Sequence, residues 1–593
     1  MASRTRHSVI VLVLLVLAIA LPPYLGVYFT RFATQIAIYG MAALSVDLLL
    51  GYTGLITFGQ SAFFGIGAYA AGMLTVSGMT NAFLTWPAAV LITMAAALVI
   101  GSLSLRTRGF QFIMLTLAFA QMAYYLAESL RSWGGDDGFT IPHRNHLAML
   151  SLQNHTVFYY VVLTLLVLVL FVTDRMVQSQ FGVVIRSIRD NERRTAAIGF
   201  SPYPYKLVAF VIAGGISGLA GALMANHAGF VGPSLLSWQL SGELLAMVIL
   251  GSANSLIGAV VGAAFFLGFR DVLSSFTEHW MLLFGLLLVA RVLLLKDGIW
   301  GLVVNAIRFS PKNAPARRRT TTRPAALPRR ETAAFVQDTL LEVAGLHKSF
   351  GALVATDGVS LSVLRGETHA LIGPNGAGKT TLIGQLTGEL IPDNGQIRFG
   401  GRDITRLSTA ERARLGLARS FQITSLFDSF TAEGNVAVAV QATEPHSFRF
   451  WRRAAAIPRL RESAHRLLQD VGLAECAGRV VSYLSHGQRR QIEICMAFAP
   501  QPSMLLLDEP MAGLGVEETQ AMSAMIGGLK KQYTILLVEH DMDVVFSLAD
   551  RISVLVGGQI VATGTVDEIR DHPAVRTAYL GNETEFDECD VDG

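Results

Sequence analysis

The sequence predicts a multi-domain protein with an N-terminal all-α polytopic membrane domain and a C-terminal α/β domain of the P-loop type. Three observations lead to this prediction. The chain has 593 residues, which is too long for one ordinary domain. It is 52% hydrophobic and only 15% charged, a composition too apolar for a soluble enzyme. The stretch GPNGAGKTT at 373–381 matches the phosphate-binding pattern G-x-x-x-x-G-K-[ST].

Apolar segments long enough to cross a membrane fill the first half of the chain. They lie near residues 9–29, 33–50, 61–78, 86–105, 110–130, 156–173, 206–225, 241–268 and 276–295. The first follows basic residues, as in a secretory signal. Because further apolar segments follow at once and no small-residue cleavage site stands out, we interpret it as the first membrane helix.

Basic residues between the spans indicate which ends face the cytoplasm. The clusters are Arg4 with Arg6, Arg106 with Arg108, the group at 175–206, and Arg291 with Lys296. If all clusters lie on the cytoplasmic side, an even number of spans must separate each cluster from the next. Only the last two clusters break this rule. Since GSANS interrupts the segment 241–268, we expect a broken or re-entrant element there, which leaves about eight full spans.

Three acidic residues, Asp47, Glu128 and Glu243, fall in or near these apolar segments. A charge in lipid is costly, so each hints at a transport pathway. Glu128 and Glu243 lie close enough to segment ends to be interfacial, whereas for Asp47 a position lining the interior and a purely structural one both stay open. The glycines of GIGAYAAG at 65–72 and GGISGLAGA at 214–222 favour close helix packing.

The polar segments differ in character. The loop 131–155 should be external, where its GGDDG turn could contact an outside partner. The loop 174–205 has an amphipathic, Arg-rich helical pattern, for which a solvated basic face is the simplest reading. Residues 305–337 form a basic linker rich in Pro, Thr and Arg that can lie against anionic lipid. No aromatic platform accompanies it, so we expect no nucleic acid as a partner.

Cysteine usage favours a reducing compartment for the second half of the chain. Cys476, Cys495 and Cys589 are all C-terminal, and no C-x-x-C spacing occurs. Disulfide scaffolding and structural zinc are therefore not expected.

The phosphate-binding loop predicts that the chain binds a nucleoside triphosphate. Its glycines let successive backbone N–H groups turn toward the phosphates, and the helix predicted at 380–387 presents its positive N-terminus to the same anion. Lys379 adds a point charge, and the Thr380 hydroxyl is a ligand for Mg²⁺. The apolar run 368–372 before the loop has the pattern of a buried strand.

Four further elements follow in an informative order. Gln422 lies in ARSFQIT, and LSHGQ at 484–488 precedes a helical stretch. MLLLDEP at 504–510 is a buried strand that ends in two acids, and LLVEHD carries His540 to the end of another strand. Taken singly, such residues are usually structural, but all of them in this order and spacing are unlikely to occur by chance.

This set resembles the ATP-binding cassette of ABC transporters, across residues 340–581. The resemblance implies a C-terminal α/β P-loop ABC ATPase domain that uses ATP and Mg²⁺. It implies that Gln422 senses the metal and the attacking water, that Asp508 holds Mg²⁺ together with Thr380, that Glu509 orients or deprotonates the water, and that His540 contacts the γ-phosphate. The residues that the resemblance assigns to nucleotide binding are Phe350, Gly373, Pro374, Asn375, Gly376, Ala377, Gly378, Lys379, Thr380, Thr381, Ser485 and Gly487.

In this family Ser485 and Gly487 contact the nucleotide held by the opposite cassette, so one cassette cannot complete a site. Two residues depart from the usual pattern. His486 stands where many cassettes have Gly, a change that related importers tolerate as Tyr. Gly515 stands where Asp or Asn is usual, which bears on how strongly the two sites communicate.

In the loop 174–205, the residues Glu192, Ala196, Ala197 and Gly199 resemble the EAA-type cytoplasmic loop of ABC importer permeases. That loop forms a short helix that sits in a groove of the ATPase. The resemblance implies that this segment couples the two domains mechanically.

Both halves of the chain resemble branched-chain (hydrophobic) amino acid ABC importers. The membrane half does so through GYTGLITFGQSAFFGIGAYAAG at 51–72, RGFQFIMLTLAFAQ at 108–121 and WQLSGELLAMVILG at 238–251. The second half does so through its closing stretch GQIVATGTVDEIRDHPAVRTAYLG. GSANSLIG at 251–258 departs from the Gly-Gly and Gly-Thr pattern usual there, which leaves the substrate open.

The sequence is therefore identified as a permease fused to its ATPase, with a permease domain at 1–304, the linker at 305–337, a cassette at 338–581 and an acidic tail at 582–593. The resemblance implies a multi-pass protein of the cytoplasmic membrane, with the ATPase and linker in the cytoplasm. It implies a second half, either identical or similar, and an external substrate-binding protein as partners. Uptake of urea or short amides is the nearest alternative, followed by export and by a membrane-tethered signalling ATPase.

Overall fold

The computed structural model describes residues 26–147, 150–294, 298–307, 338–444, 447–530 and 532–573, together with Val575 and scattered positions between 13 and 24. The chain divides into two compact units. Unit 1 comprises residues 1–189 and 203–317, and unit 2 comprises residues 190–202 and 318–593. Part of the expected span at 9–29, most of the linker at 305–337 and all of the acidic tail at 582–593 lie outside the described residues.

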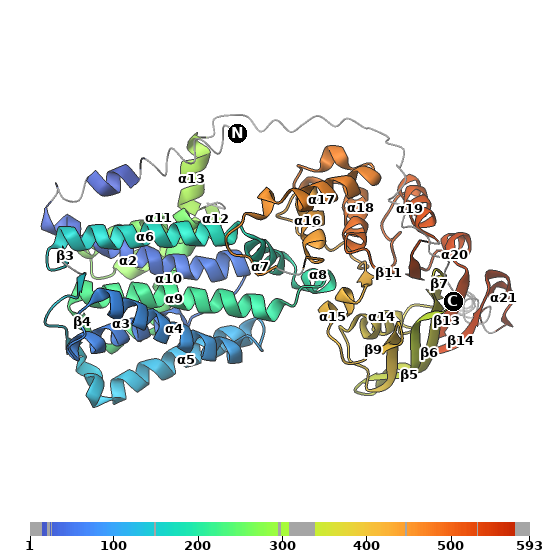
Figure 1. Ribbon diagram of the computed structural model, residues 1–593, viewed down its shortest axis with the longest axis horizontal. Helices are drawn as coiled ribbons and strands as arrows, with labels where there is room; N and C mark the ends of the chain where they lie inside the picture. The colour runs from blue at the N-terminus through green and yellow to red at the C-terminus, as the bar shows by residue number, and fades with distance from the viewer. Residues whose placement is uncertain are drawn as a thin grey trace, which may run out of the picture. The chain divides into compact units, whose positions relative to one another are not determined.

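Unit 1 is a bundle of helices (Figure 1). Its helices are α2 (Val27–Asp47), which continues as the π-helix η1 (Leu48–Thr53), α3 (Gln60–Val76), α4 (Ala82–Ser104), α5 (Phe110–Ser129), α6 (His155–Val177), α7 (Gln180–Asp190), α9 (Pro202–Ala228), α10 (Trp238–Gly251), α11 (Leu256–Ser274), α12 (Trp280–Leu294) and α13 (Gly298–Ile307). Within the expected external loop 131–155 are the short helices η2 (Arg131–Trp133) and η3 (Gly135–Asp137) and three short strands. Of these, β1 (Phe139–Thr140) pairs with β4 (Phe230–Val231), and β2 (His146–Leu147) pairs with β3 (Leu150–Ser151).

Six helices of the described residues are long and apolar enough to cross a membrane. They are Val27–Thr53, Ala82–Ser104, Phe110–Ser129, His155–Val177, Pro202–Ala228 and Leu256–Ser274. Two further apolar helices, α10 and α12, are shorter. The apolar segments expected from residue 33 onward therefore do form helices, whereas the count of about eight spans remains a prediction.

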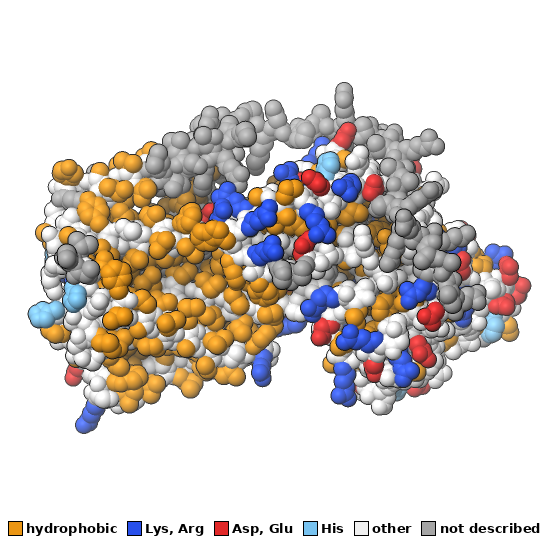
Figure 2. Space-filling view, in the orientation of Figure 1, with side chains coloured by type: hydrophobic (Ala, Val, Ile, Leu, Met, Phe, Trp, Pro, Cys, Tyr) orange, Lys and Arg blue, Asp and Glu red, His pale blue; other side chains and the backbone are white. Residues whose placement is uncertain are grey.

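Hydrophobic side chains cover much of the visible face of unit 1 (Figure 2). Exposed large apolar residues occur along its long helices, among them Phe83, Leu91, Met122, Phe171 and Leu282. Such a surface is unfavourable in water and suits contact with lipid.

Glycines bring the helices of unit 1 into close contact. A Cβ atom added at Gly221 would lie 1.8 Å from the backbone oxygen of Phe64, and one at Gly67 would lie 2.1 Å from the oxygen of Gly218. A side chain at these positions would force α3 and α9 apart. The close packing that the sequence favoured for 65–72 and 214–222 is confirmed.

The apolar segment 241–268 is broken, as expected, and forms the helix pair α10 and α11. The break contains two non-glycine residues with positive φ, Ser252 at 141° and Asn254 at 69°. Asp47, which is fully buried, accepts a hydrogen bond from the backbone N–H of Asn254 at 2.7 Å. The carboxylate thus satisfies a donor that the helix break leaves free.

Unit 2 contains two sheets (Figure 1). The larger has six strands in the order β10 (Leu417–Arg419), β11 (Met504–Asp508), β12 (Thr534–Val538), β7 (Thr368–Ile372), β13 (Arg551–Val556) and β14 (Gln559–Gly564). All neighbours are parallel except β13 and β14. The smaller, antiparallel sheet has the order β6 (Leu353–Leu364), β5 (Thr339–Phe350), β8 (Asn394–Phe399) and β9 (Arg402–Asp403).

The strands β7, β11 and β12 are buried at every residue. Such strands read as continuous apolar runs because helices or other strands cover both faces of a parallel sheet. Leu382, Ile383 and Leu386 of α14 (Lys379–Thr387) belong to the same buried core as residues of both sheets.

The remaining helices of unit 2 complete its architecture. They are α8 (Glu192–Ala197), α15 (Thr409–Arg414), α16 (Ala432–Gln441), η5 (Ala454–Ala456), α17 (Pro458–Asp470), η6 (Ala474–Cys476), η7 (Val481–Tyr483), α18 (His486–Phe498), α19 (Val516–Leu529), α20 (Met542–Leu548) and α21 (Val566–Arg570). The predicted helical character of the loop 174–205 is confirmed by α7 and α8.

Candidate active site

The carboxyl ends of three parallel strands of unit 2 bring the sequence-predicted residues to one edge of the sheet. The loop 373–378 follows β7, Asp508 and Glu509 end β11, and His540 follows β12. Ligands of open α/β sheets bind outside this edge, where loops meet helix N-termini. The fold therefore gathers the predicted loop and acids at the kind of location where parallel-sheet proteins bind nucleotides.

The phosphate-binding loop turns into α14 through glycines that no other residue could replace easily. Gly378 has φ 100° and precedes the first residue of the helix. A Cβ atom there would lie 2.1 Å from the backbone oxygen of Ala355. Positive φ and this close approach explain why glycine is required at the position. The helix N-terminus and the neighbouring N–H groups then form a positive concavity suited to phosphates.

Lys379 lies at the start of α14, and its ammonium group folds back over the loop. Its Nζ donates to the backbone oxygen of Gly373 at 2.5 Å and to that of Pro374 at 3.2 Å. Burial lowers the pKa of Lys379, while Glu509 and Asp508 act in the opposite direction. The rest of the predicted loop, Asn375, Gly376, Ala377, Thr380 and Thr381, completes the turn between strand and helix, with Asn375, Gly376 and Thr380 exposed.

Asp508 and Glu509 occupy different environments although they are adjacent. Asp508 is buried, and its Oδ2 accepts a hydrogen bond from Arg419 Nη2 at 3.3 Å. Burial raises the pKa of Asp508, and Arg419 opposes the shift. Glu509 is only partly buried and has φ 45°, an uncommon backbone conformation for a non-glycine residue. Its N–H donates to Val538 at 2.9 Å, which fixes the turn against β12.

Gln422 directly contacts Glu509. Its Nε2 donates to Glu509 Oε2 at 2.8 Å, although the two residues are 87 positions apart. Gln422 is exposed, so the pair lies where solvent and substrate can reach it. The structure thus brings together two residues to which the sequence pattern assigned water and metal contacts.

His540 and Phe350 are exposed. The side chain of His540 is 64% exposed, and its backbone N–H donates to Glu539 Oε2 at 3.2 Å. Burial raises the pKa of Glu539, which also accepts the N–H of Met511 at 2.9 Å. Phe350 ends β5 and has Lys348 Nζ 5.7 Å from its ring centroid. An exposed aromatic ring at this position suits stacking on a planar base.

The signature residues Ser485 and Gly487 begin α18. Ser485 caps the helix, with its Oγ accepting from the N–H of Gln488 at 3.3 Å. A Cβ at Gly487 would lie 2.4 Å from Glu518 Oε1, so glycine allows α18 to approach α19 closely. Within the described residues, no hydrogen bond or ion pair joins these two residues to the phosphate loop. Gly515, the second departure from the cassette pattern, precedes α19 without a side chain to cap it.

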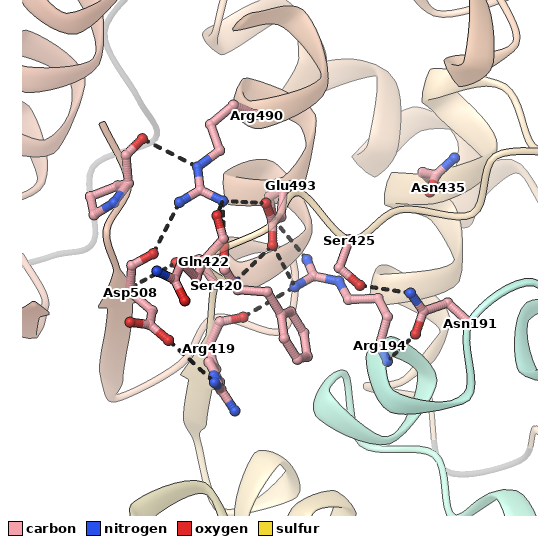
Figure 3. A network of polar contacts seen from close by, with 12 residues as sticks. Asn191, Arg194, Arg419, Ser420, Gln422, Ser425, Asn435, Arg490, Glu493 and Asp508 are labelled. Carbon is pink, nitrogen blue, oxygen red and sulfur yellow. Dashed lines mark hydrogen bonds and ion pairs between the residues drawn. The ribbon is translucent and has the colours of Figure 1, made fainter. Parts of the chain in front are cut away.

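Arg490 is a functional candidate that the sequence reasoning missed. It is buried in α18, and its guanidinium donates to the backbone oxygens of Asp508 at 3.0 Å, Glu509 at 2.7 Å and Pro510 at 3.2 Å. It also donates to the backbone oxygen of Phe421, next to Gln422. One side chain therefore clamps the two loops that carry Gln422 and Glu509 (Figure 3).

Glu493, one turn after Arg490, was missed as well. Its Oε2 pairs with Arg490 Nη1 at 2.9 Å, and its Oε1 accepts the N–H of Phe421 at 2.8 Å. A glutamate in the otherwise apolar run IEICMAF was the available signal, since a charge on a buried helix face needs partners.

Residues 190–202, which include the predicted coupling residues, lie within unit 2, against α15, β10 and α18. Asn191 caps α8 by accepting the N–H of Arg194 at 2.9 Å, and its Nδ2 donates to Ser425 Oγ at 2.7 Å. Gly199 has φ 110° and lies against Arg414. Of the other predicted residues, Ala197 is buried, whereas Glu192 and Ala196 are half-buried.

Comparison with known proteins identifies both units. The model of an ABC transporter matches residues 356–512, and that of a branched-chain amino acid ATP-binding cassette transporter matches 559–585. A branched-chain amino acid transport system permease component matches residues 28–292. Fold, site and these matches define an ABC transporter in which a permease and an ATP-hydrolysing cassette share one chain.

Individual relatives narrow the class. The high-affinity branched-chain amino acid transport ATP-binding protein BraF of Pseudomonas aeruginosa is 41% identical over 254 residues, covering 41% of this chain and 98% of its own. The corresponding LivG proteins of Salmonella typhimurium and Escherichia coli are 41% and 39% identical over 249 residues, with the same coverage. The chain belongs to the branched-chain amino acid ABC transporter family.

Among solved structures, a nucleotide-free ATP-binding cassette from an ABC transporter is 30% identical, with a TM-score of 0.37, and covers 41% of this chain and 99% of its own. The family and the apolar helices together make the chain a membrane-integral transporter with a cytoplasmic ATPase that binds and hydrolyses ATP.

Proposed function

We propose that this chain is one half of an ATP-driven importer that moves branched-chain or other hydrophobic amino acids across the cytoplasmic membrane into the cell. The observation that carries the proposal is that two parts of one chain independently match branched-chain transport models, the permease at 28–292 and the cassette terminus at 559–585. No observation of comparable weight favours urea, export or signalling.

The cassette residues suit hydrolysis of the β–γ phosphate bond. The loop N–H groups and Lys379 Nζ bind the β- and γ-phosphates, and Phe350 stacks on adenine. Gln422 Nε2 donates to Oε2 of Glu509, which orients this carboxylate. The other carboxylate oxygen of Glu509 then holds the attacking water. The water oxygen bonds to the γ-phosphorus as the bond to the bridging oxygen breaks, and Glu509 receives the proton. His540 donates to the γ-phosphate oxygens, where negative charge is concentrated.

The same site suits Mg²⁺. Its donors would be the hydroxyl of Thr380, the amide oxygen of Gln422 and, through water, the carboxylate of Asp508. Among the described residues no cluster of three or more His, Cys, Asp or Glu side chains is found, and Mg²⁺ ordinarily uses few protein oxygens beside phosphates and water. Bound Mg²⁺ neutralises charge on the phosphates. Replacement of Asp508 by Asn should therefore raise the Mg²⁺ concentration that gives half-maximal hydrolysis.

A complete transporter requires a second half. Ser485 and Gly487 contact the nucleotide of the opposite cassette in this proposal, so that two ATP molecules draw two cassettes together. The second half is either another copy or a similar fused chain. An external substrate-binding protein delivers the amino acid to the loops of the permease, including 131–155.

We further propose the domain boundaries 1–304, 305–337, 338–581 and 582–593, with the segment 190–202 as the mechanical coupling between permease and cassette. Support for the coupling role comes from the clustering of 190–202 with the cassette, and from the hydrogen bonds of Asn191 to Ser425 and of Ser429 N–H to Asp190 at 3.1 Å. Movement of the cassettes would then move α7 and the permease helices.

Uptake by living cells tests the proposal. A strain from which the chain is deleted, then supplied with the wild type or with Glu509→Gln, is given radiolabelled leucine or urea. We expect leucine uptake to be lost on deletion, restored by the wild type and not by the variant, and inhibited by isoleucine and valine. Unchanged leucine uptake together with lost urea uptake would refute the substrate class.

A further inference from the structure

Arg194 is the most deeply buried charge of the coupling segment. Its side chain is 0% exposed, whereas Arg193, its neighbour in α8, is exposed. Nη1 of Arg194 donates to the backbone oxygen of Arg419 at 3.1 Å, and Nη2 donates to the backbone oxygen of Glu493 at 2.8 Å. Figure 3 shows the guanidinium pointing from α8 toward Glu493. A basic residue in a cytoplasmic loop would ordinarily keep its head group in water.

The burial of this charge is compensated by Glu493. Nη1 of Arg194 lies 3.7 Å from Glu493 Oε1, and the carboxylate is itself 0% exposed. Burial raises the pKa of Glu493 and lowers that of Arg194, and in each case the partner's charge opposes the shift. A buried ion pair of this kind contributes little net stability, but loss of one partner leaves the other charge unpaired in the interior.

Glu493 connects Arg194 to the active site through two short routes. Its Oε1 accepts the N–H of Phe421, the residue before Gln422, at 2.8 Å. Its Oε2 holds Arg490, whose guanidinium donates to the backbone oxygens of Asp508 and Glu509 at 3.0 and 2.7 Å. The carboxylate is therefore shared between a guanidinium from the coupling segment and one that clamps the catalytic loops (Figure 3).

A third contact reaches the metal-binding carboxylate. The backbone oxygen of Arg419 accepts from Arg194, and the side chain of Arg419 pairs with Asp508 at 3.3 Å and with Glu389 at 2.8 Å. Arg194 thus supports two residues, Arg419 and Glu493, that position Asp508, Glu509 and Gln422. None of these contacts involves substrate, so any effect of Arg194 on hydrolysis is indirect.

We propose that Arg194 is a positioning residue for ATP hydrolysis, which orients the loops of Gln422 and Glu509 through Glu493 and Arg490 only when the coupling segment is docked in the cassette. This inference rests on the proposed coupling role of 190–202. It assigns a rate-controlling contact to a residue outside the cassette, so that the permease sets the catalytic competence of its own ATPase.

The test compares Arg194→Met with Arg193→Met in the full-length chain in lipid nanodiscs. Both variants remove one positive charge from α8, but only the first removes a buried one. We expect Arg194→Met to lower kcat for ATP about tenfold with little change in KM, the scale set by loss of one charged hydrogen-bond network. Arg193→Met should stay within about twofold of the wild type, since an exposed charge contributes little.

A double-mutant cycle distinguishes positioning from simple destabilisation. Glu493→Gln alone should also lower kcat, because Glu493 holds Arg490 as well as Arg194. Since Arg194 acts through this carboxylate, the combined loss in the double variant Arg194→Met, Glu493→Gln should be smaller than the product of the two single losses. Multiplicative losses in the double variant would contradict the proposal. So would equal kcat in Arg194→Met and Arg193→Met, or a fall in kcat that vanishes when rates are divided by the folded fraction. Absence of ATPase activity in the wild type would instead contradict the proposed function.

Discussion

The cassette and the membrane unit differ in the charges that they bury. In the cassette, the Arg490 side chain donates to several backbone oxygens at once, and the carboxylates of Glu493 and Asp508 pair with buried guanidinium groups. In the membrane unit, close contacts join glycine to backbone, as at Gly221 and Phe64. Among the described residues of this unit, Asp47 is the buried side chain that can carry a charge, and it accepts from the backbone N–H of Asn254. The cassette therefore surrounds its catalytic loops with paired buried charges, whereas the described part of the membrane unit buries one charge and packs its long helices closely at glycines.

The largest effect should come from the cassette carboxylate that contacts Gln422. Glu509→Gln keeps the shape of the side chain but removes its ability to accept a proton, so steady-state ATP hydrolysis should fall by about 10²–10⁴-fold while ATP still binds. Phosphate release and equilibrium nucleotide binding measure the two quantities. Glu517→Gln, an exposed residue of the same unit, is the control and should retain full activity. Wild-type turnover in Glu509→Gln would contradict the catalytic role of this carboxylate and, with it, the cassette half of the comparison.

Shape in the membrane unit is tested by adding one methyl group. Gly221→Ala places a Cβ where the Phe64 oxygen would be 1.8 Å away, so α3 and α9 must separate, at a cost of about 3 kcal/mol. Gly268→Ala is the matched control, since nothing lies within 4 Å of its added Cβ. Thermal unfolding in the same detergent should show a lower Tm for the first variant only. Equal Tm values for the two variants would mean that close helix contacts at glycine do not determine the stability of the membrane unit.

Two substitutions of Asp47 test whether this buried carboxylate has a structural role or a role in transport. Asp47→Leu removes the hydrogen bond that the carboxylate accepts from the N–H of Asn254, which should cost about 1 kcal/mol and reduce transport several-fold. In Asp47→Asn the side-chain oxygen can still accept this hydrogen bond, so stability should stay near that of the wild type. Loss of transport in Asp47→Asn at unchanged Tm would instead assign the carboxylate's charge to the transport pathway.

The smallest effect concerns a thiol in the cassette core. Burial raises the pKa of Cys495 to about 12 from an ordinary value of 9, so folding favours the neutral thiol. This contribution to stability is fully present below pH 9 and is lost only as pH rises through about 12. At pH 8 an alkylating reagent should therefore modify the Cys495 peptide only after unfolding, as mass spectrometry would measure. Rapid modification of the native protein would contradict a closed core at this helix.

The same contrast explains what could be predicted from the sequence. The loop at 373–381 and the acids at 508–509 were found because few residue types can cradle a phosphate or activate water, and their chemistry fixes their identity. Arg490 was missed because its partners are mostly backbone oxygens, which leave no trace in residue type, and Glu493 because its partners Arg194 and Arg490 come together only in the fold. In the membrane unit, helix positions followed from apolar length, and the break at 252–255 followed from the interruption GSANS.

Arg194 shows where pattern reasoning reaches its limit. In sequence it is one of several arginines in a basic loop, where a solvated face was the simplest reading. Its burial depends on contacts of α8 with β10, α15 and α18, elements that begin more than 200 residues later. Which arginine of a basic run becomes buried is decided by contacts with segments far along the chain. The composition of the run does not reveal these contacts.

The central claim, that ATP hydrolysis by the cassette is coupled to import through the permease of the same chain, is tested most directly in lipid nanodiscs. ATPase activity of the purified full chain is measured alone, with a candidate external binding protein, and with that protein loaded with leucine, isoleucine, valine or urea. We predict stimulation that requires both the binding protein and a branched-chain amino acid. Hydrolysis that is indifferent to every loaded binding protein would contradict the account.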